Sequence, residues 1–184
     1  MRAYGRRWRA WLVGVALGLL PGIACAGGAF PASYDKPIRE AWAIYHPADD
    51  WRWWKAQLWQ ESQLDPNARS PVGAEGIAQF MPRTATQYGL MDRRMAEPSI
   101  YAGARMMRDL TRFWSAPRTA QSRRRLAQAS YNAGAGNLLK AQHKCGGNEW
   151  EMISPCLREV TGRYSLETLT YVTRIERWYR AMVA

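Results

Sequence analysis

The chain has 184 residues, of which 47% are hydrophobic, and its 26 lysines and arginines outnumber its 15 aspartates and glutamates to give a net charge of +11. This length allows one domain with a hydrophobic core, and no repeat, low-complexity tract or flexible linker indicates a second. The basic balance favours a polyanionic partner, although positive charge also serves solubility alone.

The N-terminus has the three parts of a secretory signal peptide. Residues 2–9 hold four arginines and no acidic residue, residues 11–20 are apolar, and residues 24–26 form an A-x-A triplet. The apolar run is too short for a stable membrane span. We therefore predict cleavage after Ala26 and export to the periplasm, with residues 1–26 as the signal peptide.

Export affects both the new N-terminus and the class of partner. Loss of residues 1–26 removes four positive charges and no negative ones, so the net charge of the mature chain is +7. The anionic cell wall and membrane surface match such a protein better than nucleic acid does. Lipid attachment at Cys25 is the less favoured alternative, because Gly22 stands where a bacterial lipoprotein signal usually carries leucine.

After the signal peptide, we expect an N-terminal segment over residues 27–48 and a mainly α-helical domain over residues 49–184. Asp49 or Asp50 is predicted to cap a tryptophan-rich helix that ends near Ser62, before a loop at residues 65–76. Helical spacing and cap residues predict further helices over residues 36–46, 82–89, 97–114, 123–131 and 136–142, and from an N-cap at Ser165 to the C-terminus. Strand signals are weak throughout.

Two cysteines remain after cleavage, Cys145 and Cys156. Two cysteines close in sequence in an exported protein indicate one disulfide. A zinc site with His143 is the alternative, but it lacks a fourth ligand nearby, so we predict no metal and no cofactor.

Glu61 is the first candidate for chemistry. In a helix, Trp51, Trp54, Leu58 and Glu61 fall within less than about a quarter turn. If this arc faces the core, loss of hydration raises the pKa of the carboxyl, and a carboxylic acid that is protonated near neutral pH can donate a proton to a leaving group. The pattern alone leaves open whether Glu61 is such an acid or an exposed residue at a helix end.

Two further segments carry residues suited to sugar binding. Gly73, Ala74 and Gly76 lie in a loop just after Glu61, where glycines let the backbone approach a ligand. The amide of Gln79 can both donate and accept, and residues 129–134 (ASYNAG) offer a phenol and an amide beside a turn. Taken singly, each of these residues has an ordinary structural explanation.

Together and in this order, the segments resemble the soluble-type (SLT) lytic transglycosylases, which are grouped with goose-type lysozyme. The resemblance runs from about Trp51 to the C-terminus. It is carried by Glu61-Ser62, by residues 70–85 (SPVGAEGIAQFMPRTA), by Tyr131 to Gly134, by residues 167–172 (ETLTYV) and by residues 97–107. It implies a lysozyme-like single helical domain with an extended groove and little or no sheet.

The resemblance also implies an activity, cleavage of the β-1,4 bond between N-acetylmuramic acid and N-acetylglucosamine of peptidoglycan to give a 1,6-anhydro sugar. No second carboxylate has comparable support in the sequence, and the resemblance implies that Glu61 would be the single acid and base. Supporting or substrate-binding roles would fall to Ser62, Gly76, Gln79, Met81, Tyr131, Asn132, Glu167 and Tyr171. A muramidase that uses water and a non-catalytic wall-binding module are the alternatives. A secretion, conjugation or phage-related envelope machine is the kind of partner that small members of the family serve.

The chain departs from the family pattern at three positions. Ile77-Ala78 replaces the usual Leu-Met, Ser130 replaces Ala, and Glu75 stands where a small polar residue is common. None of these changes removes the acid, so the resemblance predicts retained activity with altered sugar contacts.

Overall fold

The computed structural model describes residues 30–184. The predicted signal peptide, its cleavage after Ala26 and the alternative of lipidation at Cys25 therefore lie outside the described residues. Within the described residues, no helix is long and apolar enough to cross a membrane.

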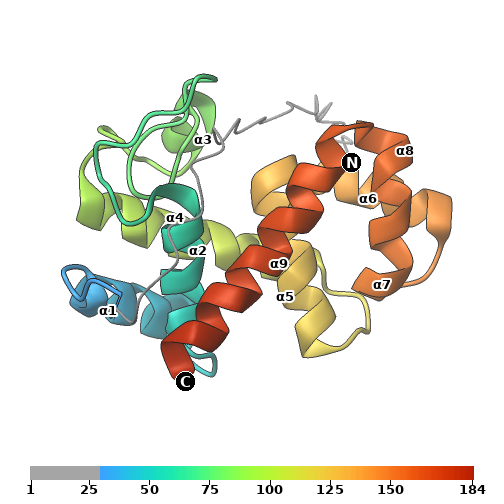
Figure 1. Ribbon diagram of the computed structural model, residues 1–184, viewed down its shortest axis with the longest axis horizontal. Helices are drawn as coiled ribbons and strands as arrows, with labels where there is room; N and C mark the ends of the chain where they lie inside the picture. Colours follow the sequence, from blue (N-terminus) through green and yellow to red (C-terminus); the bar gives the residue numbers. More distant parts are fainter. Residues whose placement is uncertain (1–29) are drawn as a thin grey trace, which may run out of the picture.

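The described part of the chain is built from helices of unequal length (Figure 1). They are α1 (Asp35–Tyr45), α2 (Arg52–Ser62), α3 (Pro82–Gln87), α4 (Ala96–Phe113), α5 (Ala120–Ala133), α6 (Ala135–Cys145), α7 (Trp150–Ile153), the 3-10 turn η1 (Ser154–Cys156), α8 (Leu157–Thr161) and α9 (Tyr164–Val183). Between residues 30 and 184, β pairing is limited to isolated bridges of Glu75 with Arg69 and with Phe80. The predicted mainly α-helical class is confirmed.

Helix α9 crosses the molecule diagonally, with α1 to α4 on one side and α6 to α8 on the other (Figure 1). It packs against α2 and α5, while α1 packs against α4. The face of α9 that meets these helices buries Tyr171, Val172 and Ile175. This packing places the C-terminal helix directly against the tryptophan-rich helix, although the two are far apart in sequence.

Trp54 of α2 lies at the centre of the core. Its ring is fully buried, as are Leu58 on the same face and Ile100 on α4. The indole nitrogen donates a hydrogen bond of 3.2 Å to the Ile100 carbonyl, which satisfies the one polar atom that a buried tryptophan carries. The sequence left open whether this arc of α2 faces the core, and the structure shows that it does for Trp54 and Leu58, whereas Trp51 is only partly buried.

Helix α1 belongs to the same core, although it falls in the segment 27–48. Ile38, Ala41 and Trp42 are buried. In addition, Lys55 of α2, only 5% exposed, forms an ion pair of 2.5 Å with Asp35. The N-terminal part of the described chain is therefore attached to α2 by both apolar packing and charge.

The observed helices differ from the predicted ones at several boundaries. Ser165 is not the N-cap of α9, because the helix begins one residue earlier and the Ser165 hydroxyl donates to the Gly162 carbonyl at 2.8 Å. Neither Asp49 nor Asp50 is the N-cap of α2, because that position is Trp51, although Asp50 Oδ1 accepts the Arg52 backbone N–H at 3.0 Å. The elements α7, η1 and α8 were not predicted, since each is too short to show a helical period.

The predicted disulfide between Cys145 and Cys156 is present, with a Cα–Cα distance of 5.8 Å. It joins the end of α6 to η1 and closes the loop that contains α7. Because both thiols are used, the alternative of a zinc site with His143 is wrong.

Gly103 makes the central position of Trp54 possible. A Cβ at residue 103 of α4 would lie 2.5 Å from the Trp54 ring, whereas a Cβ at Gly136 of α6 would meet nothing within 4 Å. We expect Gly103→Ala to lower the free energy of unfolding by about 1–3 kcal/mol through overpacking. The control Gly136→Ala should change it by less than about 1 kcal/mol. Urea denaturation of both variants measures this, and equal effects would contradict the packing explanation.

Candidate active site

Glu61 is the second-last residue of α2, and the chain turns away immediately after it. Gln63 caps the helix in the left-handed conformation with φ of 57°, and Leu64 follows with φ of 66°. The Gln63 N–H closes the last turn on the Trp59 carbonyl at 2.9 Å. Glu61 thus remains on the buried face of α2, while the residues that follow it form the loop that leads to α3.

The Glu61 carboxyl is buried, with 9% of the residue exposed. Burial raises its pKa to about 8, the hydrogen bond from Tyr171 acts to lower it, and the nearby charge of Glu167 raises it. The sequence left open whether Glu61 is solvated or buried, and the structure shows that it is buried. Burial thus favours the protonated form of this carboxyl near neutral pH.

Two tyrosines lie beside this carboxyl, one from α9 and one from α5. The Tyr171 hydroxyl donates to Glu61 Oε1. The Tyr131 hydroxyl instead donates to the Ala78 carbonyl at 2.7 Å. Burial, and then the charge of Glu61, raises the pKa of both phenols well above the usual value. Both tyrosines therefore remain protonated and act as hydrogen-bond donors.

Several of the predicted site residues hold the loop between α2 and α3. The Ser62 hydroxyl donates to the Ile77 carbonyl at 2.8 Å. Gln79, which is 8% exposed and has φ of 47°, donates its amide to the Ala68 carbonyl at 3.2 Å and the Gly76 carbonyl at 3.0 Å. Ser62 and Gln79 thus fix the backbone next to Glu61.

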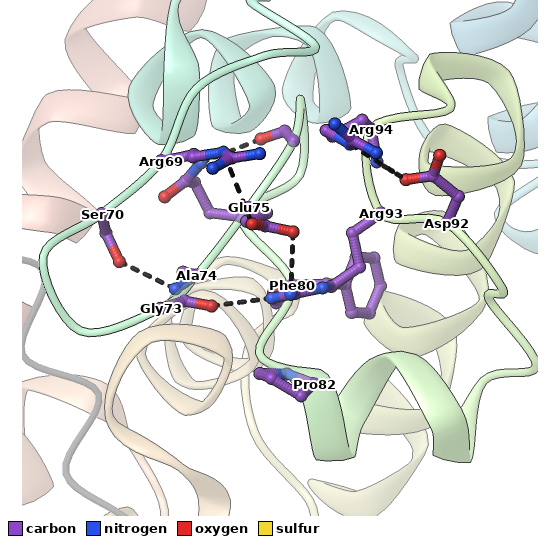
Figure 2. A network of polar contacts seen from close by, with 12 residues as sticks. Arg69, Ser70, Gly73, Ala74, Glu75, Phe80, Pro82, Asp92, Arg93 and Arg94 are labelled. Carbon is purple, nitrogen blue, oxygen red and sulfur yellow. Dashed lines mark hydrogen bonds and ion pairs between the residues drawn. The ribbon is translucent and has the colours of Figure 1, made fainter.

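Glu75 has a clear structural role in this loop (Figure 2). Its carboxylate forms ion pairs with Arg93 at 2.8 Å and Arg69 at 3.5 Å, and its backbone pairs with Phe80. Arg93 also donates to the carbonyls of Gly73 at 2.7 Å and Phe80 at 3.0 Å. The unusual acid in the family motif therefore closes the loop through Arg93, a residue that the sequence did not single out.

Ala78 also departs from the family pattern, and it faces the interior. Its side chain is fully buried, so its methyl group offers no surface to a sugar. Its backbone carbonyl accepts the bond from Tyr131. The effect of this position on the site therefore passes through the placement of Tyr131.

The remaining predicted residues connect the sequence motifs with one another. Asn132 of α5 accepts a hydrogen bond of 2.8 Å from Thr168 of α9, and both are buried. Glu167 precedes Thr168 in the first turn of α9 and acts electrostatically on Glu61. Met81 is partly buried and is the N-cap residue of α3. Thr168 lay inside the quoted motif, but nothing in the sequence assigned it a partner.

The structure therefore gathers a helical core around a buried acid that two phenols and a closed loop surround. Residues 42–153 match the Transglycosylase SLT domain family, and the chain belongs to this family.

Individual relatives agree with this assignment. The chain is 34% identical over 152 residues to the membrane-bound lytic murein transglycosylase F of Photobacterium profundum, which covers 73% of this chain and 29% of that protein. It is 32% identical over 155 residues to the protein of the same name in Shewanella oneidensis, and this match covers 75% of this chain and 32% of that protein. The chain thus spans less than a third of these curated relatives.

Solved structures show the same fold. The lytic transglycosylase Slt of Pseudomonas aeruginosa, in an inactive variant, superposes with a TM-score of 0.64 at 21% identity, covering 83% of this chain and 24% of that one. The 70 kDa soluble lytic transglycosylase of Escherichia coli gives a TM-score of 0.61 at 22% identity, with coverage of 84% and 25%. The lysozyme-like helical fold predicted from the sequence is confirmed.

Gly76 is the position of the loop with the least room for a side chain. Gly76 has φ of 82° and a Cβ there would lie 1.8 Å from the Arg93 carbonyl oxygen, whereas Gly73 has φ of 90° with nothing within 4 Å. We expect Gly73→Ala to cost about 1–2 kcal/mol of backbone strain. Gly76→Ala should cost more than about 3 kcal/mol, because two backbone segments must separate. Urea denaturation compares the two variants, and equal costs would show that the contact with Arg93 is unimportant.

The buried Glu61 should make stability depend on pH. Between its ordinary pKa of 4.5 and its folded pKa of about 8, the folded protein keeps a proton that the unfolded chain has released. The contribution of Glu61 to the free energy of unfolding therefore falls as pH rises, by up to about 1.4 kcal/mol per pH unit. We expect the free energy of unfolding of Glu61→Gln, minus that of the unaltered protein, to increase as pH rises through this window, measured by denaturation at each pH. The exposed control Glu40→Gln should follow the unaltered protein, and a constant difference for Glu61→Gln would contradict the raised pKa.

Proposed function

We propose that this protein is a lytic transglycosylase that cleaves the β-1,4 bond between N-acetylmuramic acid and N-acetylglucosamine in peptidoglycan, with Glu61 as its single acid and base. The observation that supports this most is the buried Glu61 carboxyl, with a pKa of about 8 and a hydrogen bond from Tyr171, in a chain of the SLT family. The names of the curated relatives support the same substrate.

In the first half of the proposed reaction, neutral Glu61 gives its proton to the glycosidic oxygen. The bond between this oxygen and the anomeric carbon breaks, and the charge that develops on the sugar is oxocarbenium-like or is stabilised by its own acetamido group. Glu61 is left as a carboxylate, and the Tyr171 hydroxyl stabilises this ionised form by donating to Oε1. Proton donation is efficient because the pKa of the acid lies close to neutral pH.

In the second half, the Glu61 carboxylate removes the proton from the 6-hydroxyl of the same N-acetylmuramic acid. The oxygen attacks the anomeric carbon and closes a 1,6-anhydro ring, while Glu61 returns to its neutral form. No water is consumed, and the attacking group is tethered to the substrate, so the protein gains proximity without holding a water molecule. One carboxyl therefore suffices for both proton transfers.

Hydrolysis by water is the alternative outcome for the same bond. Glu167 is the carboxylate whose charge acts on Glu61, and its position in the first turn of α9 complements the helix dipole. We assign Glu167 an electrostatic role that helps to keep Glu61 protonated. The mass of the product distinguishes the two reactions, since the anhydro sugar is lighter by one water.

We therefore expect purified peptidoglycan digested with this protein to release muropeptides of the anhydro mass, measured by mass spectrometry. Glu61→Gln should lower the rate of release by about 10²–10⁴-fold while the protein stays folded, because the amide cannot donate the required proton. Glu40→Gln, an exposed change of the same chemistry on α1, should retain the full rate.

Products at the hydrolysed mass would convert the assignment to a muramidase. Undiminished release by folded Glu61→Gln would show that Glu61 is not the acid, and binding without any release by the unaltered protein would indicate a wall-binding module.

A further inference from the structure

A buried amide lies one helical turn before Glu61 on α2. Gln57 is only 1% exposed, and residues four apart on a helix lie on the same face. This face of α2 is covered by α9, which contributes Tyr171, and it also meets Met107 of α4. Gln57 is therefore placed beside the same phenol that contacts the acid.

The side chain of Gln57 has two polar partners. One is the sulfur of Met107, at 3.4 Å from the amide nitrogen. The other is the Tyr171 hydroxyl, whose side-chain hydrogen bond with Gln57 acts to lower the pKa of that phenol against the larger raising effect of burial. This direction means that the amide donates and the phenol oxygen accepts. An amide has two N–H groups, so it can serve both partners.

Ordinary core packing does not explain an amide at this position. A buried amide costs about 1–3 kcal/mol unless it is hydrogen-bonded, and methionine would fill a similar volume without a polar group. The Met107 sulfur is a weak acceptor that compensates little. The Tyr171 hydroxyl is the stronger of the two partners.

We propose that Gln57 is a positioning residue that acts on Glu61 through Tyr171. The amide donates to the Tyr171 oxygen, and the Tyr171 hydroxyl donates to Glu61 Oε1. For its consequence in catalysis, the inference rests on the proposed function, in which Glu61 is the acid and base.

Two physical effects follow from this chain of hydrogen bonds. A hydroxyl that accepts a hydrogen bond becomes a better donor, so Gln57 strengthens the bond from Tyr171 to Glu61. The amide also restricts rotation of the Tyr171 hydroxyl, which otherwise has a free torsion. Both effects favour the ionised form of Glu61, the form that must take the second proton.

The experiment is a pH titration of the Glu61 side-chain carboxyl by carbon-13 NMR in the full protein and its variants. Gln57→Met should raise the pKa of Glu61 by about half a unit, because a weakened Tyr171 bond stabilises the carboxylate less. Tyr171→Phe should raise it further. The double variant should titrate like Tyr171→Phe alone, since Gln57 has no second route to the acid.

Gln128→Met is the matched control, because Gln128 is also 1% exposed and lies on α5. It should leave the pKa of Glu61 unchanged. Gln57→Leu has a similar volume and provides a second variant if Gln57→Met does not fold.

An unchanged pKa of Glu61 in a folded Gln57 variant would overturn the proposal and leave Gln57 as a packing residue. The proposal would also be overturned if the shift in the double variant equalled the sum of the shifts in Gln57→Met and Tyr171→Phe. Gln57 would then act on Glu61 without Tyr171. If the protein is active, the alkaline limb of its pH–rate profile should move to higher pH as the pKa of Glu61 rises. If the unaltered protein has no activity, the proposed function fails while the titration still tests the role of Gln57.

Discussion

The hydrogen bond from Tyr171 to Glu61 joins α9 to the end of α2 across 110 positions of sequence. It can form only because α9 packs along α2, and this packing depends on a core in which Trp54 and Leu58 occupy the face of α2 that also carries Glu61. The same burial that stabilises the fold removes water from the carboxyl. Fold stability and the chemistry of the acid are therefore coupled through one helix face.

The family motif divides into residues that face the acid and residues that hold the backbone. Tyr171 and Glu167 act on Glu61 directly, whereas Ser62, Gln79 and Asn132 form hydrogen bonds within the loop and between α5 and α9. The hydrogen bonds of this second group hold the loop and the helices that surround the buried Glu61 carboxyl. A motif of sugar-binding residue types can thus be mainly a motif of loop construction.

The sequence predicted the helical class and the disulfide, because each rests on a local pattern of spacing or composition, and helical spacing placed Trp54, Leu58 and Glu61 on one arc without deciding whether that arc is buried. It could not decide the environment of Glu61 by itself, since that depends on Tyr171 in another helix. The ion pair of Glu75 with Arg93 and the bond of Gln57 with Tyr171 were missed for the same reason. The short elements α7 and α8 show no helical period, and the start of α9 at Tyr164 is set by the turn at Gly162.

In the proposed mechanism, a carboxyl that donates one proton and later accepts another must be able to reach both of its charge states. Burial and the charge of Glu167 favour neutral Glu61, and its position at the C-terminal end of α2 acts in the same direction, because the carbonyl end of a helix disfavours negative charge. Among the described residues that act on Glu61, Tyr171 favours the carboxylate through its donated hydrogen bond. Burial alone would favour the neutral form of Glu61 more strongly and would oppose the proton donation that the proposed mechanism requires. In the proposed mechanism, Tyr171 provides the opposing influence that lets one acid serve both proton transfers, and a residue that orients its hydroxyl would affect both halves of the reaction.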